Sequence, residues 1–360
     1  MSKVFMVDMR SSPKRGMMTK LEELMESVNI SGMIDSGDLV VVKTHFGERG
    51  STAFVPVVYI RRLVERVKKL GGKPFLTDSG ILYVGGRSNA YDHLCTASFH
   101  GFSQETAGAP IIIADGLTGH DFVEIEVGGR YFEKVKIASA AVHAQAMIIV
   151  THMTGHELTG FGAALKNVGM GLGSRGGKQQ MHSDVRPEVD EAKCTACATC
   201  IEYCPAGAIS MVGKGKSKHA TIDHDKCIGC GECTVMCLEG AIAARWEEGD
   251  PGVSQRKIAE YAKGVLKGKE GKYAFFNFLT RISPACDCWN YSDVPAVPDI
   301  GILASTDIVA IDQASVDLVN REAGKDLFRS LYPNVDWGIQ VEHAEEMGLG
   351  SRDYELVKLG

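Results

Sequence analysis

Eight of the eleven cysteines in this sequence fall in two runs that share one internal spacing. The runs are Cys194, Cys197, Cys200 and Cys204, then Cys227, Cys230, Cys233 and Cys237. Two-residue gaps let one short loop supply three thiolates to a cubane cluster, and the fourth cysteine of each run then ligates the other cluster. The spacing therefore predicts two [4Fe–4S] clusters, one on Cys194, Cys197, Cys200 and Cys237, and the other on Cys227, Cys230, Cys233 and Cys204.

Two other uses of cysteine are weighed against clusters. Zinc sites pair C-x-x-C units over longer gaps and need no third cysteine at the same step. Disulfides need an oxidising compartment, and the N-terminal residues lack the anatomy of a signal peptide. The spacing favours clusters over both alternatives.

Residues 188–246 resemble a bacterial-type two-cluster ferredoxin. Pro205 and Ala208-Ile209 match the usual pattern, and Ala241-Ile242 repeats it, so the segment is similar to an internal duplication. Leu238 departs from the pattern, because the family usually has proline after the fourth cysteine. That departure changes the local backbone but not the number of ligands, and the resemblance implies that both clusters are present.

A second group of residues with possible chemistry lies outside these runs. His45 and His152 each follow an apolar strand, His156 lies four residues further on, and Cys286 and Cys288 form a close pair. In open parallel sheets, ligands bind outside the carboxyl ends of the strands. We expect His45, His152 or His156, and the two cysteines to meet at one catalytic rim, together with polar residues after the other strands, including Ser305 to Asp307.

The chemistry of that rim has several interpretations. Imidazole and thiolate together suit zinc or another borderline-soft metal, so an additional metal is one hypothesis. A redox pair formed by Cys286 and Cys288 is another, and inert buried cysteines are the structural alternative. The spacing of His152 and His156 is weak as a zinc motif because Thr154 and Gly155 do not favour a helix. For the histidines, surface or hydrogen-bonded core positions are the alternative, and for Asp115 and Asp307 helix caps or turns are favoured.

Residues 160–177 are rich in glycine, and the part from Lys166 to Lys178 carries three cations, Lys166, Arg175 and Lys178. Backbone amides in such a loop can bind an anion, although the pattern is neither a Walker loop nor a dinucleotide fingerprint. A flexible active-site loop or packing glycines are the alternatives. Lys214 to His219, between the two cysteine runs, is expected to be a solvated loop, with a dock for an acidic redox partner as the alternative.

Composition limits the class of protein. The net charge of −6 argues against nucleic-acid binding. We expect no membrane span, because no apolar run approaches the roughly 20 residues that a bilayer needs. Cluster thiolates need reducing conditions, so we expect the protein to be cytoplasmic. The oligomeric state stays open.

Apolar runs and helical periodicity alternate on both sides of the cysteine runs. Strands are expected at 37–45, 73–78, 110–115, 146–151, 273–279 and 299–304, a hairpin at 122–135, and helices at 57–67, 88–101, 138–145, 254–266 and 307–320. One more helix is expected after residue 333. The fold class is therefore α/β, with a mostly parallel sheet in a host domain of residues 1–187 and 247–360 and a ferredoxin-like domain inserted at 188–246.

The host sequence resembles a known family. Lys43 to Glu48, Thr77 to Ser79, His152 to Asn167, Cys286 to Cys288 and Asp299 to Ser305 occur in an order similar to that of the iron–sulfur proteins of domain-of-unknown-function family 362. The resemblance implies an α/β domain with a ferredoxin insert. It brings no settled reaction, so function has to be argued from the site.

Two functions follow as hypotheses. In the first, the protein is a cytoplasmic iron–sulfur redox protein, an oxidoreductase if it is an enzyme, whose clusters exchange electrons with the rim. Its partner would be a redox protein or a small anionic substrate. In the second, it is a non-enzymatic electron carrier or a cluster-bearing assembly factor that binds a protein partner. Converging histidines and cysteines far from the clusters would favour the first.

Overall fold

The computed structural model describes residues 1–360 except 83–84, 183–186, 205, 228–231 and 245–249. Pro205 and Cys230, both named in the sequence analysis, lie outside the described residues. Within them, no helix is long and apolar enough to cross a membrane.

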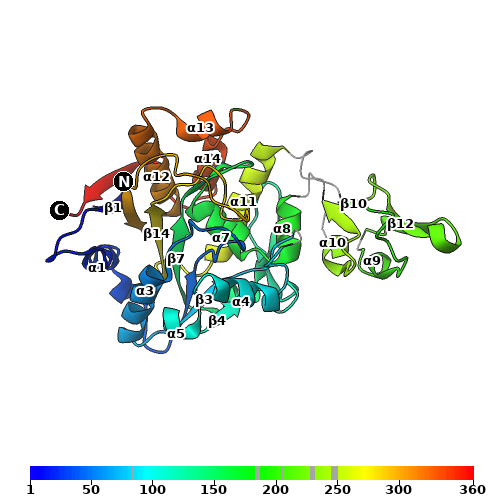
Figure 1. The fold of residues 1–360 in the computed structure, drawn as a ribbon, viewed down its shortest axis with the longest axis horizontal. Helices are drawn as coiled ribbons and strands as arrows, with labels where there is room; N and C mark the ends of the chain where they lie inside the picture. The colour runs from blue at the N-terminus through cyan, green and yellow to red at the C-terminus, as the bar shows by residue number, and fades with distance from the viewer. Residues whose placement is uncertain (83–84, 183–186, 205, 228–231, 245–249) are drawn as a thin grey trace.

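One eight-stranded sheet organises most of the chain (Figure 1). Its strands, in spatial order, are β16 (Tyr354–Lys358), β1 (Ser2–Asp8), β15 (Gly301–Ser305), β14 (Tyr273–Leu279), β7 (Ala146–His152), β2 (Leu39–Lys43), β3 (Lys73–Asp78) and β4 (Ile111–Ile113). All pairings are parallel except the two made by β15, which runs opposite to β14 and β1. The expected α/β class with a mostly parallel sheet is confirmed.

The sheet is covered on both faces, which explains its continuous apolar strands. Side chains of a strand alternate between faces, and in β7 Met147 and Ile149 enter one hydrophobic core while Ile148 and Val150 enter the other. In Figure 1 helices lie on both sides of the strands. Strand ends buried in this way can hold polar groups away from water.

The longer helices follow from local sequence signals. In α3 (Val57–Lys69) the buried residues recur with helical spacing after Pro56. In α12 (Ile308–Ala323) the Asp307 side chain accepts hydrogen bonds from the first-turn backbone, so the cap interpretation of Asp307 is confirmed. The remaining host helices are α1 (Met17–Ser27), α2 (Ile30–Met33), α4 (Ala90–Phe99), α5 (Gln104–Ala107), α6 (Ser139–His143), α7 (Ala164–Leu172), α8 (Arg175–Met181), α11 (Pro251–Leu266), α13 (Leu327–Leu331) and α14 (Gly338–Glu346).

Most expected elements are present. The expected hairpin forms β5 (Phe122–Glu126) and β6 (Lys134–Ala138), and the short pair β8 (Thr154–His156) and β9 (Gly160–Gly162) follows β7. The outer strands β16 and β1 were not among the expected strands. They lie at the ends of the chain and pair with each other, a long-range contact that leaves little local signal.

Two expectations about the chain were wrong. Because β15 is antiparallel, its carboxyl end points away from the shared rim, so Ser305 to Asp307 lie at the opposite edge of the sheet. The glycine-rich stretch is mostly helical rather than a loop, and its glycines allow close packing. A Cβ on Gly169 of α7 would lie 2.2 Å from the Ile258 carbonyl oxygen of α11. This contact supports the packing alternative for Gly169, and anion binding stays a prediction.

Residues 188–246, called the cysteine segment below, project beside α8 (Figure 1). The segment contains α9 (Thr199–Glu202), β11 (Ile209–Val212), the 3₁₀ turn η1 (Gly215–Ser217), β12 (His219–Ile222) and α10 (Glu232–Met236). β10 (Pro187–Val189) pairs with β13 (Ile242–Ala244) and so joins its two ends. Strands from both sides of this segment lie in the large sheet, while the boundaries at 188 and 246 stay a prediction.

Candidate functional site

Cys286 and Cys288 meet in the loop between β14 and β15. Their Sγ atoms lie 3.0 Å apart, and the backbone N–H of Cys288 donates to Cys286 Sγ at 3.3 Å. Cys286 is buried, whereas Cys288 is only half-buried. The contact between the sulfurs is a hydrogen bond that Cys286 Sγ donates to Cys288 Sγ.

Asp287, between the two cysteines, fixes this loop. His152 Nδ1, at the end of β7, donates to Asp287 Oδ2 at 2.8 Å, and His152 Nε2 lies 2.8 Å from the Thr280 carbonyl oxygen. The backbone N–H of Glu48 donates to the Asp287 carbonyl oxygen at 2.9 Å. Burial lowers the pKa of His152, but the carboxylate of Asp287 outweighs burial and raises it. His152 therefore positions the cysteine loop and does not contact the sulfurs.

The same loop packs tightly against β8. A Cβ on Gly155 would lie 2.0 Å from the Pro284 carbonyl oxygen, and the Gly155 N–H donates to the Ser283 carbonyl oxygen at 2.9 Å. The Tyr332 hydroxyl donates to the Pro284 carbonyl oxygen at 2.8 Å. The sequence analysis treated Gly155 only as a weak helix former, but here it permits the close approach of two chain segments.

Lys166, in the first turn of α7, supplies the positive charge beside the sulfurs. Its Nζ lies 3.1 Å from Cys286 Sγ and 3.9 Å from Cys288 Sγ. An ammonium at a helix N-terminus opposes the helix dipole and is also costly to bury. The sulfurs supply the compensating negative charge, so the contact stabilises both α7 and the cysteine loop.

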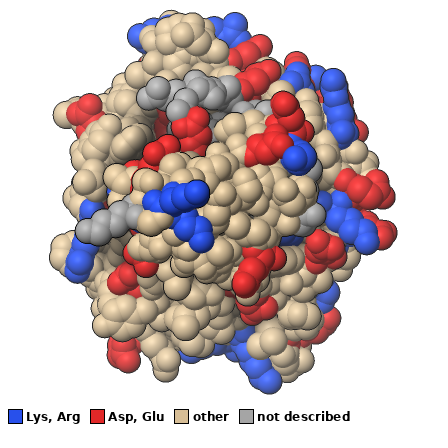
Figure 2. Space-filling model, turned by 90° about the vertical axis from the view of Figure 1, so that its right-hand side faces the viewer, with Lys and Arg blue, Asp and Glu red and all other residues tan. Residues whose placement is uncertain are grey.

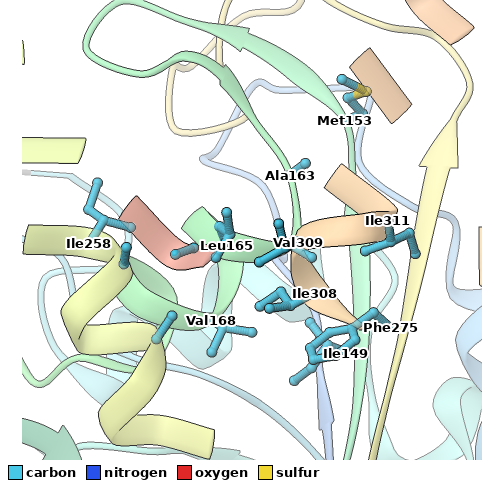
Figure 3. Packing of buried hydrophobic residues seen from close by; sticks show 14 of the residues in the cluster. Ile149, Met153, Ala163, Leu165, Val168, Ile258, Phe275, Ile308, Val309 and Ile311 are labelled. Atoms are coloured by element: carbon cyan, nitrogen blue, oxygen red, sulfur yellow. The ribbon is translucent and has the colours of Figure 1, made fainter. Parts of the chain in front are cut away.

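Packing holds α7 in this position. Figure 3 shows Leu165 and Val168 of α7 between Ile258 of α11 and Val309 of α12. The free backbone N–H groups of Ala164 and Leu165 donate to the two carboxylate oxygens of Asp312 at 2.9 and 2.8 Å. A carboxylate from α12 thus caps α7, although burial raises the pKa of Asp312 to about 6.

The charges within the pair are unequal. The hydrogen bond with Cys288 and burial raise the pKa of Cys286, whereas the hydrogen bond from Cys286 lowers the pKa of Cys288, helped by the positive charge of Lys166. Burial lowers the pKa of Lys166, but the charge on the cysteines outweighs it and raises that pKa. Both directions agree with the hydrogen bond that Cys286 donates to Cys288.

His45 contacts this pair from the end of β2. Its Nε2 lies 3.6 Å from Cys288 Sγ and 2.8 Å from Arg87 Nη1, while the Gly47 N–H donates to Nδ1 at 3.0 Å. A neutral ring that accepts from Gly47 carries its hydrogen on Nε2, facing the thiolate. A ring that accepts from Arg87 carries it on Nδ1 instead. The two contacts exclude each other, so the tautomer of His45 is linked to Arg87.

Behind His45 lies a buried network of charged groups. Lys43 Nζ lies 3.0 Å from Asp78 Oδ1 and donates to Asn167 Oδ1 at 2.7 Å. Arg87 Nε lies 3.1 Å from Glu48 Oε2. Burial raises the pKa of Asp78, but the surrounding positive groups, Lys43 first, outweigh burial and lower it. Asp78 thus remains ionised although it is buried.

His156 does not join the sulfurs directly. Its Nδ1 accepts from the backbone N–H groups of Leu158 and Thr159, both at 3.2 Å, and so closes the turn after β8. Burial and the charge of Lys166 lower the pKa of His156 to about 4. His156 is therefore neutral, and its ring accepts hydrogen bonds from the turn after β8 rather than binding a sulfur.

α8 lies between the rim and the cysteine segment. Lys178 donates to the Ser79 hydroxyl and to the Gly173 carbonyl oxygen, and burial lowers its pKa to about 8. On the same helix, Gln179 Oε1 accepts from Thr234 Oγ1 of α10 at 3.4 Å. This one short helix thus contacts α10 of the cysteine segment and also Ser79, the neighbour of Asp78 in the charged network behind His45.

In the cysteine segment, four cysteines line one cavity. They are Cys194, Cys197, Cys200 and Cys237, three from the first run and the last from the second. Cys200 is buried, and burial together with the charges of the other three raises its pKa. The set is the one that the spacing predicts for a single cluster.

Backbone hydrogen bonds repeat between the two halves of the segment. The Ala208 N–H donates to Cys204 Sγ and the Ala241 N–H to Cys237 Sγ, both at 3.3 Å. Asp190 N–H donates to the Ala241 carbonyl oxygen, and Asp223 N–H to the Ala208 carbonyl oxygen, both at 2.7 Å. The start of each half is thus joined to the end of the other. This exchange is the arrangement that lets the fourth cysteine cross over.

The other four-cysteine set is only partly described. Cys233 belongs to the small core of the segment, and Cys204 and Cys227 pack against it, while Cys230 is outside the described residues. In the part of the chain that is described, no group of three or more His, Cys, Asp or Glu side chains is arranged to hold a single metal ion. That finding covers the rim as well, and the additional metal expected there stays a prediction.

Comparison with protein families supports the resemblance noted in the sequence. The family model described as "Domain of unknown function (DUF362)" matches residues 40–317. The chain belongs to the DUF362 family. The match runs from β2 to α12, so it includes the rim residues and the cysteine segment of this DUF362 protein.

Other comparisons give only distant similarity. A lactate racemase apoprotein from Thermoanaerobacterium thermosaccharolyticum is 9% identical, with a TM-score of 0.39 over 77% of this chain and 50% of that one. A protein from Thermotoga maritima is 13% identical, with a TM-score of 0.41 over 85% and 59%. The DUF362 chain thus matches between half and three fifths of these longer chains. No curated protein matches it.

Several site residues of this DUF362 protein were not among the predicted ones. Lys166 was noticed only as a cation in a glycine-rich stretch, and Asp287 only as the residue between two cysteines. Lys43 and Arg87 were not considered as site residues. Lys43 carried a usable signal, because a lysine that ends a fully apolar strand must be buried with a partner.

Proposed function

We propose that this DUF362 protein is an iron–sulfur redox protein that holds two [4Fe–4S] clusters in its cysteine segment. One cluster would be held by Cys194, Cys197, Cys200 and Cys237, and the other by Cys227, Cys230, Cys233 and Cys204. The cavity lined by the first four cysteines carries the proposal. A [4Fe–4S] cluster occupies the volume between its four thiolates. A cavity lined by four cysteines provides such a volume.

Bound clusters would supply one-electron transfer. Donors for the cluster sulfurs are already present, because the N–H groups of Ala208, Ala220 and Ala241 point at cysteine Sγ atoms. Such hydrogen bonds influence cluster potentials. In this segment the protein therefore contributes thiolates, backbone donors and a small apolar core.

The rim around Cys286 and Cys288 is proposed as the site that exchanges electrons with the segment. The contact of α8 with α10 supports this assignment, because Gln179 touches the segment while the adjacent Lys178 contacts Ser79, next to Asp78 in the charged network behind His45. A thiol pair beside an ammonium can act as a redox group in its own right. A pure carrier would have no use for it.

Iron and acid-labile sulfide in anaerobically reconstituted protein test the proposal. We expect about eight irons per chain for two clusters. Cys204→Ser should leave about four, all in the cluster that contains Cys194, because the fourth ligand crosses over. Cys237→Ser is the matched variant and should spare the other cluster. A plateau near four irons in the wild type would refute the two-cluster assignment.

A further inference from the structure

The loop between β14 and β15 carries a second redox group. We propose that Cys286 and Cys288 form a dithiol–disulfide couple that exchanges with disulfide substrates, with Cys288 as the attacking thiolate and Cys286 as the resolving thiol. This inference rests on the proposed redox function and names the substrate class of its rim site.

The distance between the sulfurs supports a couple. The Sγ atoms lie 3.0 Å apart, so forming a disulfide of about 2.05 Å requires them to approach by roughly 1 Å. The cysteines are separated by one residue, and Asp287 is held from both its side chain and its carbonyl oxygen. The pair is thus preorganised by the surrounding chain.

The two cysteines differ in access and in hydrogen bonding. Cys286 is only 4% exposed, whereas Cys288 is half-buried and so reachable from solvent. The thiol of Cys286 donates to Cys288 Sγ, which leaves the thiolate on the more accessible sulfur. A thiolate is the nucleophile in disulfide exchange, so Cys288 is the residue that attacks.

Lys166 distinguishes this pair from inert buried cysteines. The hydrogen bonds of its ammonium within the described chain go to the two sulfurs, at 3.1 and 3.9 Å. Two neutral thiols would not repay the burial of an ammonium, whereas a thiolate would. Lys166 is therefore a positioning residue that holds the charge of the pair, and His45 Nε2 at 3.6 Å faces the same thiolate.

The exchange balances with one proton on the pair. Cys288 thiolate attacks one sulfur of the substrate disulfide, forms a mixed disulfide and releases the first substrate thiolate, which takes the Cys286 proton. Cys286 thiolate then attacks Cys288 Sγ, closes the disulfide and releases the second substrate thiolate. The substrate gains two electrons and the pair loses two. Returning the pair to thiol and thiolate takes two electrons and one proton, and two one-electron clusters match that number.

The wild-type protein gives the first test. The anaerobic holoprotein is equilibrated in dithiothreitol redox buffers, quenched in acid, alkylated and analysed by peptide mass spectrometry. We expect the peptide with Cys286 and Cys288 to change from two alkylated thiols to one disulfide, with a two-electron dependence on potential. Cys95, exposed and outside both sites, is the internal reference. Two free thiols at every potential would overturn the proposal.

Single variants test the assigned roles. Incubated with oxidised glutathione, Cys286→Ser should accumulate a glutathione adduct on Cys288, whereas Cys288→Ser should form none on Cys286. Equal adducts on both would contradict the assignment. Insulin in place of glutathione, followed by its reduction, shows whether protein disulfides are also substrates, and activity with either disulfide supports the couple.

Lys166 provides a readout that a purely structural role would not change. Lys166→Met should lower the alkylation rate of Cys288 near neutral pH by about tenfold or more, because the thiolate loses its counter-ion. Lys166→Arg should retain most of the rate. An unchanged rate in Lys166→Met would remove Lys166 from this role. Iron measured on the same samples separates failure of the cluster proposal from failure of the couple.

Discussion

The molecule has two cysteine sites that are held in place by different means. The cysteine segment has a small core, with six buried members of which two are cysteines. The pair Cys286 and Cys288 lies instead at the edge of a large sheet with an extensive core on each face. The first site therefore has little apolar packing of its own, whereas the second rests on the large cores of the host.

The charged side chains around the two sites also differ in their exposure. Figure 2 faces the end of the molecule that carries the cysteine segment and shows acidic and basic side chains interspersed there. At the rim, in contrast, Lys43, Asp78 and Arg87 are fully buried and paired. If the segment binds clusters as proposed, this arrangement lets them be loaded without rebuilding the buried, preorganised rim.

Removing iron should have the largest effect on this contrast. When the metal site does not exist in the unfolded chain, the free energy of metal binding contributes to the free energy of folding. A segment stabilised in this way unfolds when the metal is removed. After chelation we expect amide protection to disappear across 188–246 and to persist in the large sheet, as followed by hydrogen exchange. Loss of protection in β7 and β2 together with the segment would contradict independent stabilisation.

Deleting residues 188–246 tests whether the host folds without the cysteine segment. Pro187 and Ala244 are paired across β10 and β13, so the chain enters and leaves the segment on adjacent strands. With a short linker, the host should show one cooperative thermal transition. A product without such a transition would argue against a host domain that folds around the insert.

Removing the ion pair between Asp287 and His152 should have a smaller effect on stability, and this effect should be confined to the host. Asp287→Asn removes the charge that balances His152, and breaking a buried ion pair typically costs about 3–5 kcal/mol. We expect the free energy of unfolding of the host to fall by that order while iron content is unchanged. Asp293→Asn, an exposed carboxylate in the same loop, is the control. Iron loss in Asp287→Asn would contradict the separation of the sites.

The last expected effect is a pH dependence of the host, which is smaller per pH unit than the effect of Asp287→Asn. Burial lowers the pKa of His93 to about 3, so below its ordinary value near 6.5 the unfolded chain binds a proton that the folded protein does not. Stability should therefore fall as pH decreases from about 6.5 towards 3, by about 1.4 kcal/mol per pH unit for this residue. His93→Gln should flatten that slope in denaturant titrations, and an unchanged slope would exclude His93 as its source.

The sequence was informative where chemistry is encoded in local spacing. Cysteine offsets predicted which four side chains line one cavity, and apolar runs predicted six of the eight strands of the sheet. The direction of β15 was missed because a buried strand has the same pattern in either direction. That error placed Ser305 to Asp307 on the wrong edge.

The rim was harder to predict because its partners are distant in the chain. Lys166 and Cys286 are 120 residues apart, and His45 and Cys288 are 243 apart. The strand ends did predict that His45 and Cys288 would lie at one edge. They could not show that His152 binds Asp287 rather than a sulfur, or that a lysine is the cation at the pair, since such contacts depend on side-chain packing.

Counting electrons tests the central claim most directly. An anaerobic reductive titration of the oxidised, fully loaded protein should consume about four electrons per chain, one for each cluster and two for the Cys286–Cys288 disulfide. The double variant Cys286→Ala with Cys288→Ala should keep its iron and consume about two. Equal electron uptake by the two proteins would contradict the account, because it would leave the rim without a redox group.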